Sequence, residues 1–220
     1  MAKYDYVLFD LDGTLSNTSK GVFNATDYMI SKLRLRPLTE EEKRSILGPP
    51  LYQSFHKFFG LEKDDLENAV ELYREYYHEK GCYENTMYDG IVELLFKLKK
   101  SGIKLMVATS KPNNITPKVL KSFGIYDLFD YIAAPDPKSE SDDKSALIST
   151  ALDAVNCSDK SKALMVGDRL YDIAAANKVG IDSLGVTFGF GSRDELSSYN
   201  ATYIANNADE IEYVVTGGKI

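Results

Sequence analysis

The sequence of 220 residues has few cysteines and no long apolar run. Cys82 and Cys157 allow at most one disulfide bond and stand in no metal-ligand spacing, so a disulfide-rich scaffold is excluded and two free thiols are expected. No stretch reaches the roughly 18 apolar residues that a membrane-spanning helix needs. The first residues, Met1 to Asp5, lack the apolar segment of a signal peptide. These absences predict a cytoplasmic protein without a membrane partner.

Basic residues also do not outnumber acidic residues in this sequence. Asp and Glu number 33 against 26 Lys and Arg, which gives a formal net charge of −7. A chain with this balance is not expected to hold nucleic acid as its main partner. A small phosphorylated metabolite stays open as a ligand, because a local cation can reverse the potential within one pocket. No feature of the sequence predicts an oligomeric state.

Short, continuously apolar runs alternate with amphipathic segments through most of the chain. Such runs are typical of strands buried on both faces of a parallel sheet. We expect strands at Tyr6–Phe9, Lys104–Ala108, Tyr131–Ala134, Ala163–Val166, Ser183–Val186 and Thr202–Ala205. We expect helices at Ile91–Leu98, Lys144–Val155 and Ile173–Val179. The alternation predicts an α/β fold in which a mainly parallel sheet is flanked by helices.

The segment from Ser16 to Glu84 differs, because it contains helical patterns and no convincing strand. Thr39 and Glu42 have capping-box spacing, and a later tyrosine-rich stripe predicts a long helix that ends at Gly81. We therefore expect a core domain at residues 1–15 and 86–220 and an all-helical domain, inserted after the first strand, at residues 16–85. An insertion at this place would overhang the carboxyl ends of the strands, where open α/β sheets bind ligands.

Two pairs of aspartates follow apolar strands, Asp10 with Asp12 and Asp168 with Asp172. Parallel strands end at one edge of a sheet, so the four carboxylates should meet there and repel one another. A divalent cation would relieve this repulsion, and a ligand set made only of oxygens favours Mg²⁺. An ordinary Asp-Gly turn is the alternative for the first pair, and capping of a helix is the alternative for Asp172.

Hydroxyl and ammonium groups are candidate phosphate ligands at the same edge. Thr109 and Ser110 follow the second expected strand, and their donors suit phosphate oxygens, although a polar strand exit is the more ordinary interpretation. Lys144 begins an expected helix and would compensate a phosphoryl group, but a solvated lysine is equally compatible with the pattern. Lys138 competes with it for this role.

With its motifs in this order, the sequence resembles the haloacid dehalogenase (HAD) superfamily of phosphohydrolases, in the phosphoglycolate phosphatase-like branch. The resemblance covers essentially the whole chain. It rests on Asp10-Leu-Asp12-Gly-Thr-Leu, Thr109, Lys144 and Gly167-Asp168-x-x-x-Asp172. It implies a Rossmann-like HAD core with a helical cap domain.

The resemblance also implies a Mg²⁺-dependent phosphatase that acts on a small phosphate monoester. Asp10 would attack phosphorus to form an aspartyl-phosphate, and Asp12 would protonate the leaving alkoxide and later deprotonate the attacking water. The Asp10 carboxylate, the Asp12 main-chain carbonyl and Asp168 would hold Mg²⁺, with Asp172 in support. Because a halide leaving group needs no proton, Asp12 argues for phosphate chemistry over dehalogenation.

Further implications of the resemblance concern the phosphoryl group and the substrate. Thr109 and Lys144 would hold phosphoryl oxygens, and Lys144 would also restrain Asp10. Ser145 and Ala146 follow this lysine where many phosphoglycolate phosphatases have Gly-Lys-Pro, which weakens phosphoglycolate as the substrate. A β-phosphoglucomutase-like phosphosugar mutase, a nucleotidase and a pyrophosphatase remain alternatives. A non-enzymatic regulatory protein is disfavoured, because an idle site has no need of four costly charged groups.

Overall fold

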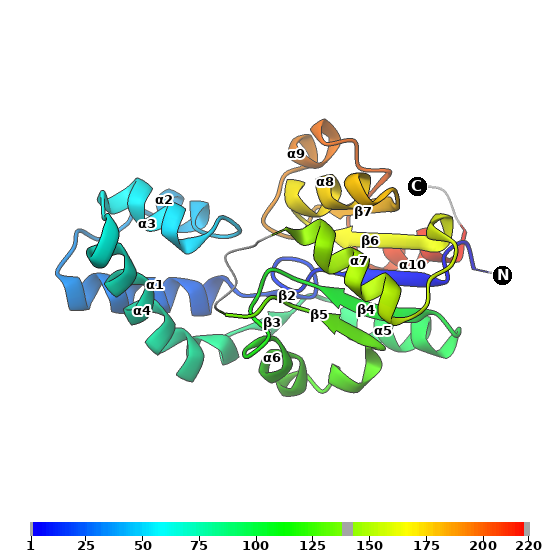
Figure 1. Cartoon of the computed structure of the whole chain (residues 1–220), viewed down its shortest axis with the longest axis horizontal. Coiled ribbons are helices and arrows are strands. Elements are labelled where there is room, and N and C mark those ends of the chain that lie inside the picture. The colour runs from blue at the N-terminus through cyan, green and yellow to red at the C-terminus, as the bar shows by residue number, and fades with distance from the viewer. Residues whose placement is uncertain (1, 138–142, 218–220) are drawn as a thin grey trace. The chain divides into compact units, whose positions relative to one another are not determined.

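The computed structural model describes residues 2–137 and 143–217 and divides into two compact units. The first, the α/β unit, consists of Met1–Asn17 and Met87–Ile220, and the second, the helical unit, of Thr18–Thr86. The expected α/β class is confirmed, because the first unit is built on a six-stranded parallel sheet (Figure 1).

The sheet has the strand order β5-β4-β1-β6-β7-β8, and every neighbouring pair is parallel. Its strands are β1 (Tyr6–Phe9), β4 (Lys104–Ala108), β5 (Tyr131–Ala133), β6 (Ala163–Gly167), β7 (Asp182–Val186) and β8 (Tyr203–Ala205). The chain builds the sheet outward from β1 on one side through β4 and β5, and then crosses to the other side at β6. Open α/β sheets bind ligands at the carboxyl ends of strands at such a reversal.

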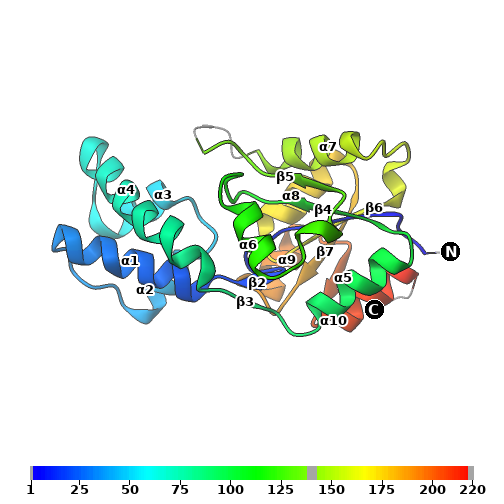
Figure 2. The same ribbon diagram turned by 90° about the horizontal axis from the view of Figure 1, so that it is seen from below.

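Helices cover both faces of this sheet. Figures 1 and 2 show α7 and α8 on one face and α5 and α10 on the other. The helices of this unit are α5 (Ile91–Lys100), α6 (Thr116–Ser122), α7 (Lys144–Ala154), α8 (Leu170–Val179), α9 (Arg193–Ser198) and α10 (Ala208–Thr216), with short 3₁₀ turns at Tyr126–Leu128 and Lys160–Lys162. Among the described residues, no helix combines the length and the apolar character needed to cross a bilayer.

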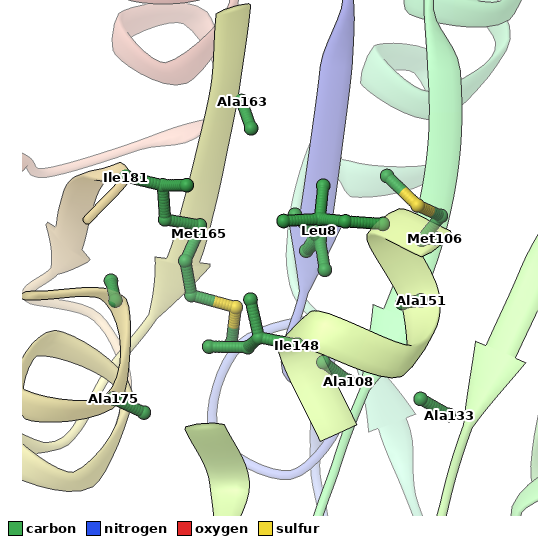
Figure 3. Packing of buried hydrophobic residues seen from close by; sticks show 12 residues of the cluster. Leu8, Met106, Ala108, Ala133, Ile148, Ala151, Ala163, Met165, Ala175 and Ile181 are labelled. Carbon is green, nitrogen blue, oxygen red and sulfur yellow. The ribbon is translucent and has the colours of Figure 1, made fainter. Parts of the chain in front are cut away.

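A cluster of buried apolar side chains fixes the three central strands. Leu8 of β1, Met106 of β4 and Met165 of β6 all lie against the helical layer that contains Ile148 of α7 (Figure 3). All four are fully buried, and burying a side chain of this size contributes about 1.5–3 kcal/mol. The core therefore holds the ends of β1, β4 and β6 in a fixed relation to one another.

The register of the ladder brings these strand ends to one level. Phe9, the last residue of β1, pairs with Val107 of β4 and with Val166 of β6. The next residue, Asp10, donates its main-chain N–H to the Val166 carbonyl at 2.9 Å. Polar residues that follow the three strands thus leave the sheet side by side.

The helical unit contains α1 (Ser19–Leu33), α2 (Glu40–Ser45), α3 (Leu51–Phe59) and α4 (Lys63–Glu79), followed by a 3₁₀ turn at Gly81–Tyr83. The capping box is present: Thr39 Oγ1 accepts from the Glu42 N–H at 3.2 Å, and Glu42 accepts from the Thr39 N–H at 2.9 Å. The start of α1 packs on the turn after α4, since a Cβ at Gly21 would lie 2.0 Å from the Gly81 carbonyl oxygen.

Some elements were not expected from the sequence. Ser16 to Glu84 was expected to contain no strand, but β2 (Ser16–Asn17) pairs with β3 (Thr86–Met87) on the two segments that join the units. Two residues are too few to show alternation of apolar and polar side chains. The helices α6, α9 and α10 were also not expected; α9, for example, buries only Leu196 and so has no apolar stripe.

Candidate active site

Three acidic side chains converge beyond the ends of β1 and β6. Asp10, Asp168 and Asp172 each offer a carboxylate oxygen, and these oxygens lie within 4.8 Å of one another. Asp168 and Asp172 have no exposed surface, and Asp10 is 7% exposed. Ionised carboxylates in so small a buried volume need positive charge close by. The side chain of Asp12 lies outside this three-acid group and takes part in a separate ion pair.

Burial and mutual repulsion resist full ionisation of this group. Burial, with added repulsion from Asp172 and Asp10, raises the pKa of Asp168 to about 8. Burial also raises the pKa of Asp172 to about 6, although the nearby Lys144 opposes this shift. Without a further cation, the site therefore retains protons on carboxyl groups that would be ionised in water.

Lys144 bridges two members of the three-acid group. As the first residue of α7 it is buried, its Nζ lies 2.9 Å from Asp10 Oδ2, and it also bonds Asp172. Burial alone would lower the pKa of this lysine, but the two carboxylates outweigh burial and raise it. Asp143 caps α7 by accepting from the Ser145 N–H at 3.0 Å, which fixes the first turn. Lys138, the competing lysine, lies outside the described residues.

Asp172 both caps a helix and belongs to the three-acid group. One oxygen accepts from the Arg169 N–H at 3.0 Å and so caps the start of α8, while the other meets Lys144. A Cβ on Gly167 would lie 2.1 Å from Asp172 Cγ, so a glycine is required where the carboxylate passes the end of β6. Capping and membership of the three-acid group are thus compatible.

A loop of main chain positions Asp168. The Phe190 N–H donates to its Oδ2 at 2.7 Å, and the Thr14 hydroxyl lies 3.4 Å from its Oδ1. A Cβ on Gly189 would lie 2.2 Å from the Gly13 carbonyl oxygen and 2.4 Å from Asp168 Cβ. The loop after β7 can approach this closely because glycines stand at positions 189 and 191.

Asp12 pairs with a lysine that the sequence analysis did not single out. Lys111 Nζ lies 2.9 Å from Asp12 Oδ1 and 2.7 Å from Oδ2. From the sequence, only the hydroxyl groups of this segment, those of Thr109 and Ser110, are expected to bind a ligand. No local pattern identifies this lysine, because β4 ends at Ala108 and the alternation of an extended strand does not carry on to position 111.

The two hydroxyl residues at the end of β4 differ in exposure. Thr109 is 1% exposed, and its Oγ1 accepts from the Lys111 N–H at 3.2 Å. Ser110 is exposed. Thr109 therefore shapes the turn that carries Lys111, whereas the Ser110 side chain faces solvent.

The charges of the site fit a divalent cation. When ionised, its four aspartates exceed the two lysines, Lys111 and Lys144, by two negative charges. In addition, Asp10 Oδ1 is buried and has no hydrogen-bond donor among the described residues. A buried carboxylate oxygen without a donor is suited to a cation or to an electrophilic centre, and an all-oxygen set suits Mg²⁺.

Comparison with known proteins identifies the family of this chain. The model of the haloacid dehalogenase-like hydrolase family matches residues 7–186. The crystal structure of a Clostridium difficile protein assigned as a phosphatase superposes with a TM-score of 0.90 at 40% identity, covering 96% of this chain and 98% of that one.

Two curated relatives match over nearly their whole length. A 5'-nucleotidase of Pseudomonas aeruginosa is 34% identical over 201 residues, 91% of this chain and 90% of the relative. A phosphoglycolate phosphatase of Vibrio parahaemolyticus is 27% identical over 217 residues, 95% of each chain. The chain belongs to the haloacid dehalogenase-like hydrolase family, and within it to the phosphatases.

Proposed function

We propose that this phosphatase hydrolyses a small phosphate monoester, depends on Mg²⁺, and passes through a phosphorylated Asp10. The observation that carries the proposal is the state of the Asp10 carboxylate. Its Oδ2 is held by Lys144, while its buried Oδ1 lacks a donor among the described residues. A carboxylate oriented by one oxygen and uncommitted at the other is suited to act as a nucleophile.

The residues that would hold the metal are the Asp10 carboxylate, the Asp168 carboxylate and the main-chain carbonyl of Asp12. Asp172 would support them through Lys144, which it shares with Asp10. When bound, Mg²⁺ would neutralise charge on the phosphoryl group. The raised pKa of Asp168 supports this assignment, because burial and the neighbouring carboxylates disfavour its ionised form and a bound cation would stabilise that form.

The proposed reaction has two steps. In the first, an Asp10 oxygen forms a bond to phosphorus, the ester P–O bond breaks, and the leaving oxygen takes a proton from Asp12. In the second, Asp12 accepts a proton from water, whose oxygen attacks phosphorus, and the acyl-phosphate bond breaks to release phosphate and free Asp10. The Asp12 side chain is 33% exposed, which supports its access to a substrate.

Other groups of the site would hold the phosphoryl oxygens. The Lys144 ammonium would offset their charge, and the Thr109 hydroxyl together with Ser110 would donate hydrogen bonds at the end of β4. Phosphoryl transfer depends mainly on positioning and on neutralisation of charge, which is the chemistry these groups offer.

The substrate class is proposed from the relatives. By name, one of them acts on nucleotides and another on phosphoglycolate, and both kinds of compound are phosphate monoesters with a small organic leaving group. We therefore propose a soluble phosphorylated metabolite as the substrate. The helical insert at residues 16–85 is proposed to act as a cap domain that selects among leaving groups.

The test is release of inorganic phosphate from a generic monoester in the presence of Mg²⁺. Wild type should release phosphate, and Asp10→Asn should fall to background. Asp5→Asn is a matched control, because the exposed Asp5 directly precedes the opposite end of the same strand. Equal activity of wild type and Asp10→Asn would refute the nucleophile, and conversion of a sugar phosphate to its isomer without phosphate release would favour a mutase.

A further inference from the structure

The two aspartates of the first motif are held by two different lysines. Lys144 reaches Asp10 from the start of α7, and Lys111 reaches Asp12 from the turn that follows β4. Lys111 contacts both oxygens of Asp12, at 2.9 and 2.7 Å. An ammonium placed between both oxygens restricts rotation of the carboxylate more than a contact to one oxygen would.

The two partners of this pair differ in their exposure. The Lys111 side chain is 4% exposed, whereas that of Asp12 is 33% exposed. The ammonium is therefore enclosed, whereas the carboxylate is partly exposed to solvent. The Lys111 ammonium lies within ion-pair distance of Asp12, so it can act through that carboxylate.

The main chain around Lys111 is anchored on both sides of the residue. Its N–H donates to Thr109 Oγ1 at 3.2 Å, and its carbonyl accepts from the Thr116 hydroxyl at 2.9 Å. Pro112 follows and restricts the backbone further. The lysine thus extends from a fixed turn, so its ammonium is a fixed reference point for Asp12.

We propose that Lys111 is a positioning residue that orients the Asp12 carboxylate for proton transfer with the leaving group. This inference rests on the proposed function and adds a residue to it. A partly exposed aspartate would otherwise rotate among several orientations, and misplacement of a proton donor by about 1 Å can lower a rate roughly 10²-fold. Lys111 should therefore matter most when the leaving group needs a proton.

The experiment compares two esters that differ in this need. Glycerol 2-phosphate has an alkoxide leaving group, which requires protonation, whereas p-nitrophenyl phosphate releases a stable phenolate. For Lys111→Met we expect kcat to fall roughly 100-fold on the alkyl ester and less than about 5-fold on the aryl ester, with KM changed less than about 3-fold. Lys111→Arg, which keeps the cation, should recover part of the lost kcat.

A double-mutant cycle with Asp12 separates positioning from other roles. If Lys111 acts through Asp12, Lys111→Met should cause no further loss in an Asp12→Asn background. Lys118→Met, at an exposed lysine of α6, is the matched control and should behave as wild type. If Lys111→Met does not give a folded protein by circular dichroism, Lys111→Gln replaces it in the same cycle.

Each outcome has a defined meaning. Equal losses on both esters, additive losses with Asp12→Asn, or a rise in KM with unchanged kcat would overturn the positioning role. No phosphate release by wild type from either ester would instead refute the proposed function, on which this role depends. Loss confined to the alkyl ester and absent in the Asp12→Asn background supports the proposal.

Discussion

Lys144 and Asp10 form a buried ion pair, with 2.9 Å between Nζ and Oδ2, that connects the first turn of α7 to the end of β1. The same ammonium bonds Asp172, so one lysine stabilises two buried carboxylates. Removing Lys144 leaves the buried carboxylates of Asp10 and Asp172 without this cation, which lowers the free energy of unfolding far more than loss of an exposed ion pair does.

Lys144→Met should lower the free energy of unfolding of the metal-free protein by about 3 kcal/mol or more at neutral pH. Urea denaturation followed by circular dichroism measures this change. The control is Lys178→Met, because the pair of Lys178 with Asp143 is largely exposed and should contribute about 0–1 kcal/mol. Similar losses for the two variants would contradict the buried role of Lys144.

The stability of the metal-free protein should fall as the pH rises from about 5 to about 8. In the folded protein the pKa of Asp168 is raised from 3.8 to about 8, so this carboxyl group keeps its proton in the folded state while the unfolded state has lost it. The stabilising contribution is therefore complete below the unfolded pKa and is lost as the pH approaches the folded pKa.

Denaturant titrations in a chelating buffer at several pH values would measure this effect. We expect a fall of roughly 1–3 kcal/mol in the free energy of unfolding across the interval. Asp168→Asn, which cannot ionise, should show a flatter dependence. A stability that rises with pH in wild type, or an identical slope in the variant, would contradict the assignment.

Gly189→Ala should weaken Mg²⁺ binding about 10- to 100-fold, because the added Cβ would displace Asp168 and the Gly13 carbonyl. Isothermal titration calorimetry measures the affinity without reference to activity. Gly185→Ala is the matched control: the three atoms nearest to its Cβ belong to the Leu196 side chain, so it should reduce stability and leave the affinity nearly unchanged. Equal affinities in both variants would show that the loop does not position Asp168.

Much of the fold could be predicted from the sequence, because a fully buried parallel sheet has a strong local signature. The run Tyr6–Phe9 is apolar throughout and forms β1 as expected, and Lys104–Ala108 likewise forms β4. The ends of these strands then locate the candidate site. An ionised carboxylate beside an apolar core costs free energy unless it is paired, so acids that directly follow buried strands indicate a functional site. Short elements such as β2 and the six-residue α9 have too few residues for a periodic pattern.

Two features of the site could not be predicted from the sequence, because they depend on tertiary structure. Lys111 is one of many lysines, and only the turn fixed by Thr109 and Thr116 aims it at Asp12. The separation of Asp12 from the three-acid group has a similar origin: β1 ends at Phe9, so the two-residue alternation no longer applies at position 12. Neither feature has a local signature in the sequence.

The charged side chains that the described residues bring to the candidate site, Asp10, Asp12, Lys111, Lys144, Asp168 and Asp172, all belong to the α/β unit. The Thr18–Thr86 segment can therefore diverge, or even be exchanged between relatives, while the groups proposed to transfer phosphate stay constant. Changes confined to this one contiguous segment could then alter which metabolite is hydrolysed without altering the hydrolytic reaction itself.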